Sequence, residues 1–285
     1  MPVIVVGNIS VGGTGKTPLV LWLAQFLREQ GLRPGIISRG YGGTAIIPQE
    51  VMPDSEPRLC GDEPVLLARK SACPVWIGRD RVAVAQALLV AHPDVNVIIS
   101  DDGLQHYRLR RDVEIAVIDG VRGLGNGFLL PAGPLREKAS RLEQVDAVVV
   151  NGATATPLPA TTAPRYHMHL NGEVFYNLLH SETRASATDL RGKTLHAVAG
   201  IGNPNRFFDH LRSLELKIVE HPFPDHHRYQ PEDLAFSGAM VMTEKDAVKC
   251  AFSGMKEAWV LAVEAEVDPG LGQIILDKLK NNHGQ

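Results

Sequence analysis

A short apolar run, a glycine-rich loop and a helical pattern follow one another directly at the start of this sequence. Val3–Val6 is typical of a buried strand, and Leu19–Gln30 of a helix that ends at Gly31. Between them lies GGTGKT, Gly12–Thr17, which matches a phosphate-binding loop except that Ser10 stands where the first glycine is expected. Because several glycines remain, we expect a strand–loop–helix unit that binds an anion at the start of its helix.

The residue types in this loop predict nucleotide chemistry. Backbone N–H groups of such a loop converge on phosphate oxygens, Lys16 would reach the β- and γ-phosphates, and the Thr17 hydroxyl would bind Mg²⁺. Partitioning-type ATPases carry a lysine just before the two glycines, and Val11 in that place counts against this class. The predicted nucleotide-binding residues are Gly12, Gly13, Thr14, Gly15, Lys16 and Thr17.

Apolar strand-like runs continue to alternate with helical patterns through the first half of the chain. Runs that are apolar on both faces and separated by helices indicate a parallel sheet covered by helices. The predicted strands after the first are Gly35–Ser38, Pro74–Ile77, Val95–Ser100, Val113–Asp119 and Val145–Asn151.

The amino-acid composition changes at residues 152–164, GATATPLPATTAP, where threonine, proline and alanine predominate, and this indicates a connector. Asn171-Gly172 then separates two strand-like runs, a hairpin signal, and the alternation restarts at Thr194. The predicted fold class is α/β, with two α/β/α lobes joined by a small β-hairpin linker, the first lobe a P-loop NTPase-type parallel sheet. The expected domains are a kinase-type lobe, a two-stranded linker and a smaller α/β lobe, at 1–164, 165–190 and 191–285.

Composition excludes several classes of protein. The chain has 285 residues and a formal net charge of −3, which argues against a general nucleic-acid binder. Its three cysteines are scattered without a C-x-x-C pair, so we expect a reducing compartment and neither a disulfide framework nor a zinc site. No apolar run approaches the roughly 20 residues of a membrane span, and the sequence shows no signal-peptide pattern.

Two acidic residues follow the strand-like run in VNVIISDDGLQH. Asp101 and Asp102 could form an Asx turn that caps the next element. However, the carboxyl end of a parallel strand faces the phosphate site in this kind of sheet. With a phosphate-binding loop upstream, the pattern favours a Walker B element in which Asp101 and Asp102 hold Mg²⁺ directly or through water.

A second acidic pair, Asp62 and Glu63, stands at a predicted helix start in CGDEPVLLA. Carboxylates in the first turn stabilise a helix by capping and by their interaction with its dipole. A carboxylate here could equally accept the proton of an attacking hydroxyl, which phosphoryl transfer to an alcohol requires. The residues alone leave both interpretations open.

Two further motifs fall in the second half. FPDHHRY places Asp225, His226 and His227 together, but without other ligands at zinc spacing, so the pattern favours loop histidines over a metal site. VMTEKDAVK places Thr243–Lys245 after a strand, where a helix cap is the simple interpretation.

Basic residues cluster after the acidic strand end and again near residue 136. Such clusters are usually solvated, although beside a phosphate site they could hold an anionic substrate. They are Arg108, Arg110, Arg111, Arg136 and Lys138.

Taken together, GNISVGGTGKTP, SRGYGG, GDEP, SDDGLQH, LPAGPLRE, DHH and MTEKDAVK resemble, in this order, the tetraacyldisaccharide 4'-kinases, the lipid A 4'-kinases of Gram-negative bacteria. The resemblance covers essentially the whole chain and includes the serine at position 10. It implies transfer of the γ-phosphate of ATP, with Mg²⁺, to the 4'-hydroxyl of a tetraacylated glucosamine disaccharide 1-phosphate. It also implies two α/β lobes joined by a two-stranded linker.

The resemblance further implies roles for individual residues. Asp62 corresponds to the catalytic base, His226 to the group that supports it, with His227 as the fallback, and Lys16 to a catalytic cation. The implied metal-binding residues are Thr17, Asp101, Asp102 and Glu137. The implied substrate or phosphate contacts are Arg39, Tyr41, Gln105, His106 and Arg136.

The family's setting implies partners and a location. The expected partners are the lipid A disaccharide precursor and the membrane surface, bound peripherally at the cytoplasmic face of the inner membrane, with no nucleic acid and a monomeric enzyme. The family usually carries a membrane-docking helix before the first strand, and this sequence starts at Met1-Pro2-Val3 without it. The alternatives are a P-loop switch ATPase or GTPase, although no guanine-reading motif is evident, and a non-catalytic nucleotide-binding scaffold.

Overall fold

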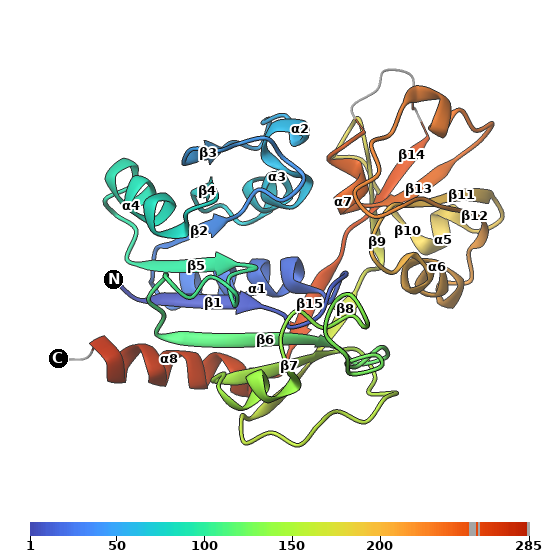
Figure 1. The fold of residues 1–285 in the computed structure, drawn as a ribbon. Coiled ribbons are helices and arrows are strands. Elements are labelled where there is room, and N and C mark those ends of the chain that lie inside the picture. Colours follow the sequence, from blue (N-terminus) through green and yellow to red (C-terminus); the bar gives the residue numbers. More distant parts are fainter. Residues whose placement is uncertain (251–254, 256, 284–285) are drawn as a thin grey trace. The chain divides into compact units, whose positions relative to one another are not determined.

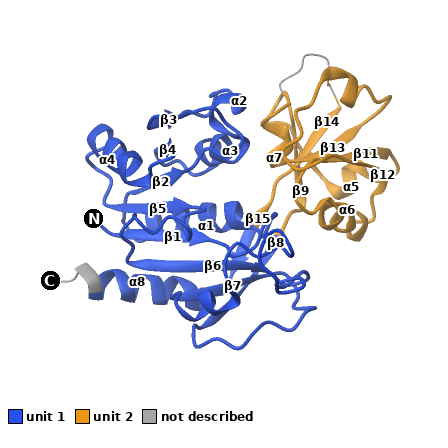
Figure 2. Ribbon diagram, in the orientation of Figure 1, with its two compact units in different colours: residues 1–170, 265–285 blue, residues 171–264 orange. Residues whose placement is uncertain are grey.

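The chain folds into two compact units in a computed structural model that describes residues 1–250, 255 and 257–283. Unit 1 comprises Met1–Leu170 and Ala265–Gln285, and unit 2 comprises Asn171–Glu264 (Figure 2). Each unit has its own sheet and its own buried core.

Unit 1 is built on one sheet whose strand order is β15-β8-β7-β6-β1-β5-β2-β4-β3. The pairs from β4 through β8 are parallel, and β3 is antiparallel to β4. Figure 1 shows β1, β5 and β6 running in the same direction, so their carboxyl ends meet at one edge. The strands are β1 (Val3–Gly7), β2 (Pro34–Ser38), β3 (Gln49–Val51), β4 (Val75–Ile77), β5 (Val97–Asp101), β6 (Val113–Asp119), β7 (Ala147–Asn151), β8 (Arg165–Asn171) and β15 (Glu264–Val267).

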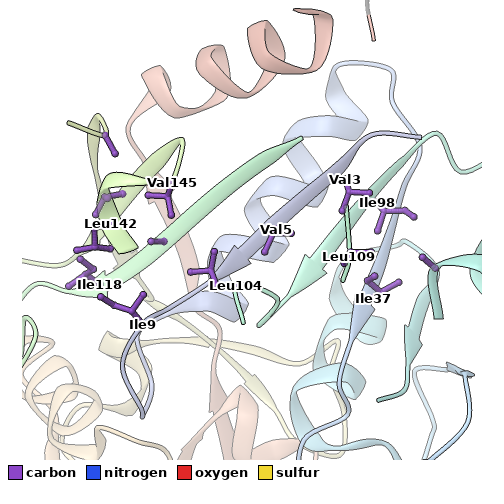
Figure 3. Close-up of a cluster of buried hydrophobic side chains, with 14 of the residues drawn as sticks. Val3, Val5, Ile9, Ile37, Ile98, Leu104, Leu109, Ile118, Leu142 and Val145 are labelled. Atoms are coloured by element: carbon purple, nitrogen blue, oxygen red, sulfur yellow. The ribbon is translucent and has the colours of Figure 1, made fainter. Parts of the chain in front are cut away.

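Helices cover both faces of this sheet. They are α1 (Lys16–Glu29), α2 (Pro57–Cys60), α3 (Asp62–Lys70), α4 (Arg81–Ala91), the 3₁₀ helix η1 (Ala139–Glu143) and α8 (Pro269–His283). Val3 and Val5 point to one face, where they share a buried cluster with Leu88 of α4 and Leu142 of η1 (Figure 3). Side chains alternate along a strand, so the equally buried Ile4 points to the opposite face. The buried residues of α1 lie outside the cluster of Figure 3, and α1 covers that opposite face.

The predicted strands of the first half all form, with boundaries that differ by one or two residues. The main difference lies at the C-terminal end, which we expected in the second lobe. Strand β15 instead lies next to β8, and Lys278 of α8 pairs with Asp146 at 2.6 Å. Gly272 lets α8 approach closely, because a Cβ there would lie 2.6 Å from the ring of Phe26 on α1. These contacts assign the last segment of the chain to unit 1.

Unit 2 has a smaller sheet with the strand order β10-β9-β14-β13-β11-β12. The pairs β14–β13, β13–β11 and β11–β12 are parallel, whereas β9 is antiparallel to β10 and to β14. One face packs on α6 through Phe207, Phe208 and Leu211, and the other face carries Tyr229, Met240 and Met242. Its elements are β9 (Val174–Asn177), β10 (Arg184–Ser186), α5 (Ala187–Leu190), β11 (Thr194–Ala199), α6 (Pro204–Ser213), β12 (Lys217–Pro222), the 3₁₀ helix η2 (Pro231–Leu234), β13 (Met240–Thr243), α7 (Glu244–Ala247) and β14 (Ala258–Leu261).

The predicted hairpin at Asn171-Gly172 is wrong. Strand β8 pairs with β7 in the sheet of unit 1, and β9 pairs with β10 and β14 in the sheet of unit 2. Neither Asn171 nor Gly172 has the positive φ that a tight hairpin turn requires. Gly172 instead allows close packing, because a Cβ there would lie 2.7 Å from the Ala262 carbonyl oxygen. The chain passes between the units at this point and again at Glu264, so β8 and β15 take the place of the expected hairpin.

Candidate active site

The glycine-rich loop joins β1 to α1 at the carboxyl edge of the unit 1 sheet. Helix α1 begins at Lys16 with Gly15 as its N-cap, at φ 92°, and no side chain among the described residues caps its first turn. Gly12 also has a left-handed backbone, at φ 91°. The free backbone N–H groups and the positive end of the helix dipole make this loop suited to bind an anion.

Residues distant in the sequence hold the loop in shape. Asn151, at the end of β7, donates from Nδ2 to the Thr14 carbonyl oxygen at 3.0 Å. Asn8 donates to the Thr14 hydroxyl at 3.3 Å, and Arg122 donates to the Val11 carbonyl oxygen at 3.2 Å. We did not identify these three residues from the sequence. Of the three, only Asn151 has a sequence feature that could have pointed to this role: it is a polar residue at the end of a buried strand that runs parallel to β1.

The segment LPAGPLRE lies directly against this loop. Val11 donates its backbone N–H to the Pro134 carbonyl oxygen at 2.8 Å, and Arg136 donates its own to the Ile9 carbonyl oxygen at 2.7 Å. The two segments therefore run side by side, although more than a hundred residues separate them. This pairing places the Arg136 side chain at the loop.

Lys16 meets the predicted acidic pair. Its Nζ lies 3.3 Å from Oδ1 of Asp102, and the Arg136 guanidinium lies 3.0 Å from both oxygens of the same carboxylate. Asp101, at the end of β5 and 1% exposed, accepts a hydrogen bond from the Ser38 hydroxyl at 3.1 Å. The structure thus brings together Lys16, Asp101, Asp102 and Arg136, as the motifs predict for the edge of a parallel sheet.

Burial and charge act differently on the two carboxyls. Burial raises the pKa of Asp101, and the neighbouring Glu63 and Asp102 carboxylates raise it further, against the effects of Lys16 and Ser38. Burial also acts to raise the pKa of Asp102, but Lys16 and Arg136 outweigh it and hold that pKa below its usual value. Asp102 is therefore the firmly ionised member of the pair.

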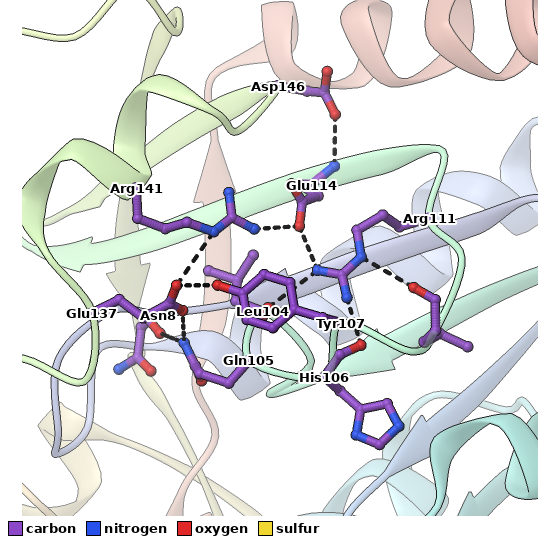
Figure 4. Close-up of polar contacts among 11 residues, drawn as sticks. Asn8, Leu104, Gln105, His106, Tyr107, Arg111, Glu114, Glu137, Arg141 and Asp146 are labelled. Carbon is purple, nitrogen blue, oxygen red and sulfur yellow. Dashed lines mark hydrogen bonds and ion pairs between the residues drawn. The ribbon is translucent and has the colours of Figure 1, made fainter.

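Glu137 lies in a polar network (Figure 4) that is connected to the acidic pair, because Gln105 Oε1 accepts a hydrogen bond from Arg136 at 3.2 Å. Its Oε1 accepts a hydrogen bond from Gln105 at 2.6 Å, its Oε2 accepts one from the Tyr107 hydroxyl, and Arg141 Nε lies 3.5 Å from Oε2. Gln105 also donates to the Asn8 carbonyl oxygen at 2.9 Å, which links the network to the end of β1. Tyr107 and Arg141 are further residues that we did not identify from the sequence.

A buried arginine, Arg81, lies close to both the acidic pair and His106. Burial lowers the pKa of His106, and the nearby Arg81 lowers it further. Arg81 is 3% exposed and donates to the Gly78 carbonyl oxygen at 2.7 Å. Burial lowers the pKa of Arg81 to about 10, against the opposing effect of Asp101 and Asp102. Arg81 is thus a buried cation that acts electrostatically on the acidic pair, and we did not identify it from the sequence.

Asp62 and Glu63 open helix α3, where Asp62 is 5% exposed. Asp62 Oδ1 accepts the backbone N–H of Glu63 at 3.0 Å. The turn before the helix packs on the SRGYGG loop, because a Cβ at Gly61 would lie 2.5 Å from the Tyr41 carbonyl oxygen. The structure therefore joins the motifs that contain Tyr41 and Asp62, while the side chains of Arg39 and Tyr41 are exposed.

The histidine motif belongs to unit 2. His227 Nε2 lies 3.0 Å from Asp233 Oδ2, and its ring packs against Phe223, with 4.7 Å between the ring centroids. His226 has a left-handed backbone, at φ 60°, and its Nε2 lies 3.8 Å from Asp225 Oδ2. Each histidine thus has a carboxylate neighbour in the same loop, Asp233 for His227 and Asp225 for His226.

Known proteins match this chain along its whole length. The family model of tetraacyldisaccharide-1-P 4'-kinases matches residues 1–280. The chain belongs to this family. A protein from Dechloromonas aromatica named tetraacyldisaccharide 4'-kinase is 56% identical over 283 residues, 98% of this chain and 84% of that protein. A relative of the same name from Methylobacillus flagellatus is 52% identical over 281 residues, which cover 98% of this chain and 82% of that protein.

A solved structure agrees with the fold as well. The crystal structure of LpxK from Aquifex aeolicus in complex with ATP superimposes with a TM-score of 0.81 and 29% identity, over 98% of this chain and 88% of that one. The resemblance inferred from the motifs and the predicted α/β fold class are confirmed. Membership in the tetraacyldisaccharide-1-P 4'-kinase family favours a kinase over a switch ATPase or GTPase, and over a non-catalytic scaffold.

Gly15 offers a test of the loop. In Gly15→Ala the new Cβ would lie 2.2 Å from Asn151 Nδ2, on a backbone with φ +92° that costs about 1–2 kcal/mol for an L residue. We expect the affinity for MgATP to fall at least about tenfold, measured by calorimetry. Gly31→Ala is the matched control, since Gly31 has φ +77° but open space around it. Equal MgATP affinity in both variants would contradict this account of the loop.

Proposed function

We propose that this chain transfers the γ-phosphate of ATP to the 4'-hydroxyl of a tetraacylated glucosamine disaccharide 1-phosphate, a step of lipid A biosynthesis. One observation carries the proposal: Lys16 of the glycine-rich loop lies 3.3 Å from Asp102, in a chain that matches the 4'-kinase family over residues 1–280. The relatives' names give the substrate class, and the loop supplies the means to bind a nucleotide.

The loop residues receive distinct roles in this proposal. The backbone N–H groups of Gly12, Gly13, Thr14, Gly15, Lys16 and Thr17 hold the phosphates of ATP. Lys16 stabilises the negative charge that builds on the transferring group and its leaving oxygens. Asn151 fixes the backbone conformation of the loop by donating a hydrogen bond to the Thr14 carbonyl oxygen. Because these donors are fixed before ATP binds, little reorganisation opposes the reaction.

The acidic pair fits a magnesium ion that is shared with the nucleotide. Asp101 Oδ1 is buried and has no hydrogen-bond partner among the described residues, so an oxygen suited to a hard cation remains available. Within the same residues, no three His, Cys, Asp or Glu side chains gather to form a complete metal site. Mg²⁺ commonly takes only one or two carboxylates, with phosphates and water completing its coordination.

We propose that Thr17, Asp101 and Asp102 hold this ion, with Glu137 as an outer member. Both Glu137 oxygens are already engaged by Gln105, Tyr107 and Arg141, which supports an indirect role for it. When bound, the ion offsets negative charge on the β- and γ-phosphate oxygens.

Asp62 is proposed as the base that accepts the proton of the attacking hydroxyl. It is a buried carboxylate at a helix start, packed on the SRGYGG loop through Gly61. His226, in unit 2, is proposed as the group that supports this step. The proposed contacts to the sugar or its phosphate are Arg39, Tyr41, Gln105, His106 and Arg136, all in loops of unit 1.

We propose peripheral binding to the cytoplasmic face of the inner membrane as a monomer, without nucleic acid. No helix among the described residues is long and apolar enough to cross a bilayer. A loop next to the glycine-rich loop exposes apolar side chains, with Phe128 63% and Leu130 53% exposed, which supports contact with lipid. Co-sedimentation with anionic vesicles tests this: Phe128→Asp should reduce binding and the exposed Val90→Asp on α4 should not.

The decisive experiment is transfer of label from γ-³²P-ATP to the 1-phosphorylated tetraacyl disaccharide in detergent micelles. We expect label in the lipid product, and none when the acceptor already carries a 4'-phosphate. Release of inorganic phosphate at a rate that the acceptor does not change would instead favour a switch ATPase. Label at any position other than the 4'-oxygen would contradict the proposed acceptor.

A further inference from the structure

Two motifs of unit 2 meet at the carboxyl edge of its sheet. FPDHHRY follows β12, and VMTEKDAVK runs from β13 into α7. Strands β13, β11 and β12 are neighbours and parallel, so the loops that follow them leave the sheet on the same side. Thr243 of the second motif caps α7 by accepting the Asp246 N–H, as expected for the start of a helix. Asp246 of the same motif makes further contacts that a helix cap does not need.

Asp246 is completely buried and collects donors from three segments. Its Oδ2 accepts the Gly200 backbone N–H at 3.1 Å and the Thr243 hydroxyl at 2.7 Å. Its Oδ1 accepts the Tyr229 hydroxyl at 3.0 Å and lies 2.8 Å from Lys249 Nζ. One carboxylate therefore ties the end of β11, the end of β13 and the end of the histidine loop together.

Burying a carboxylate is costly, and a surface residue would suffice for a helix cap. The cost is offset here by three hydrogen bonds and by the ion pair with Lys249, and hydrogen bonds to a charged acceptor are stronger than neutral ones. Burial and the Asp246 carboxylate raise the pKa of Tyr229 far above its usual range, so its hydroxyl stays protonated and donates. Three hydrogen bonds and one ion pair therefore hold the Asp246 carboxylate.

The other end of the histidine loop is also held. Phe223 donates its backbone N–H to the Ala199 carbonyl oxygen at 2.8 Å, and Lys245 Nζ lies 3.3 Å from Asp225 Oδ1. His226, between these anchors, has φ 60°, a conformation that a non-glycine residue adopts only when its surroundings hold it there. Lys245 and Asp246 thus contact the two sides of the segment that contains His226.

We propose that Asp246 is a positioning residue for the phosphotransfer, which it serves by fixing the loop that presents His226 through Tyr229 and Gly200. This rests on the proposed role of His226 in that reaction. The proposal assigns VMTEKDAVK a function that a simple helix cap does not require. It also predicts that the Tyr229 hydroxyl, remote from the glycine-rich loop in sequence, affects turnover.

A double-mutant cycle tests the proposal in the full chain. Tyr229→Phe removes one hydroxyl and keeps the ring that packs on Phe223 and His227. We expect it to lower kcat by about three- to tenfold with little change in the KM for MgATP. In a His226→Ala background the same substitution should have no further effect, because the hydroxyl acts through His226. Asp246→Asn should follow the same pattern with a larger loss.

A control separates positioning from general destabilisation. Asn177→Ala removes a buried side chain of unit 2 whose Oδ1 accepts the N–H groups of Leu179 and His180, away from this loop. We expect its effect to be unchanged by His226→Ala. A Tyr229→Phe effect that persists in full without His226, or a His226→Ala variant with wild-type kcat, overturns the proposal. Failure of the wild-type chain to label the lipid would instead overturn the proposed function.

Discussion

Lys16→Met is expected to lower kcat/KM for lipid phosphorylation by about 10²- to 10³-fold, the effect of removing one charge-stabilising group from an active site. Lys16 stands at the first turn of α1, where its ammonium can reach both the bound phosphates and Asp102. Methionine is an unbranched side chain one atom shorter than lysine, so it keeps most of the apolar packing and removes the charge. The measurement is label transfer from γ-³²P-ATP under single-turnover conditions.

Loss of fold should not account for this effect. Arg136 still pairs with Asp102 in the Lys16→Met variant, so the carboxylate keeps a cationic partner. We therefore expect thermal unfolding to shift little. Lys138→Met is the matched control, since Lys138 is an exposed lysine of the segment that pairs with the same loop, and it should retain wild-type transfer. If Lys16→Met transferred phosphate at the wild-type rate, the glycine-rich loop would not be the site of transfer.

The glycine-rich loop could be predicted because all of its determinants are local. A buried strand, closely spaced glycines and a Lys-Thr pair stand within one short stretch of sequence. The acidic pair was predictable for a similar reason, because Asp101 ends a buried strand that pairs with β1. Parallel strands bring their carboxyl ends to one edge, so these motifs had to meet.

The residues that hold the glycine-rich loop in shape could not be predicted from the sequence in this way. Asn151 lies 137 residues beyond Thr14, and it reaches the loop only because β7 joins the same sheet through β6. Glu137 was expected near the metal, yet two of its partners, Gln105 and Tyr107, come from a segment about thirty residues earlier in the chain. Such side-chain networks depend on tertiary packing, which no local pattern encodes.

The errors in the fold have a common physical cause. Asn171-Gly172 is a strong local hairpin signal, but β8 and β9 each find partners in a different sheet, and these pairings decide the backbone conformation. The final helix was assigned by its order in the chain, whereas β15 returns to unit 1 and carries α8 with it. Tertiary contacts overrode a local turn propensity in the first case and the order of the elements along the chain in the second.

Asp62→Asn is expected to lower kcat by about 10²- to 10⁴-fold, the usual contribution of a general base. Asparagine has nearly the same shape, and its side-chain oxygen can still accept the Glu63 backbone N–H that Asp62 accepts at 3.0 Å. The start of α3 should therefore survive the substitution, whereas the negative charge and the ability to take up a proton are lost. MgATP affinity, which depends on the glycine-rich loop, should remain at the wild-type value.

Glu63→Gln is the sharper comparison, because it removes the neighbouring carboxylate in the same helical turn. Glu63 raises the pKa of Asp101, so its loss should leave Asp101 more readily ionised and turnover largely intact. The roles of the two acids would be reversed if Glu63→Gln were the more damaging change. Wild-type turnover in both variants would place the base elsewhere and leave the kinase assignment standing, because the charge-stabilising part of the reaction depends on Lys16 and not on this helix.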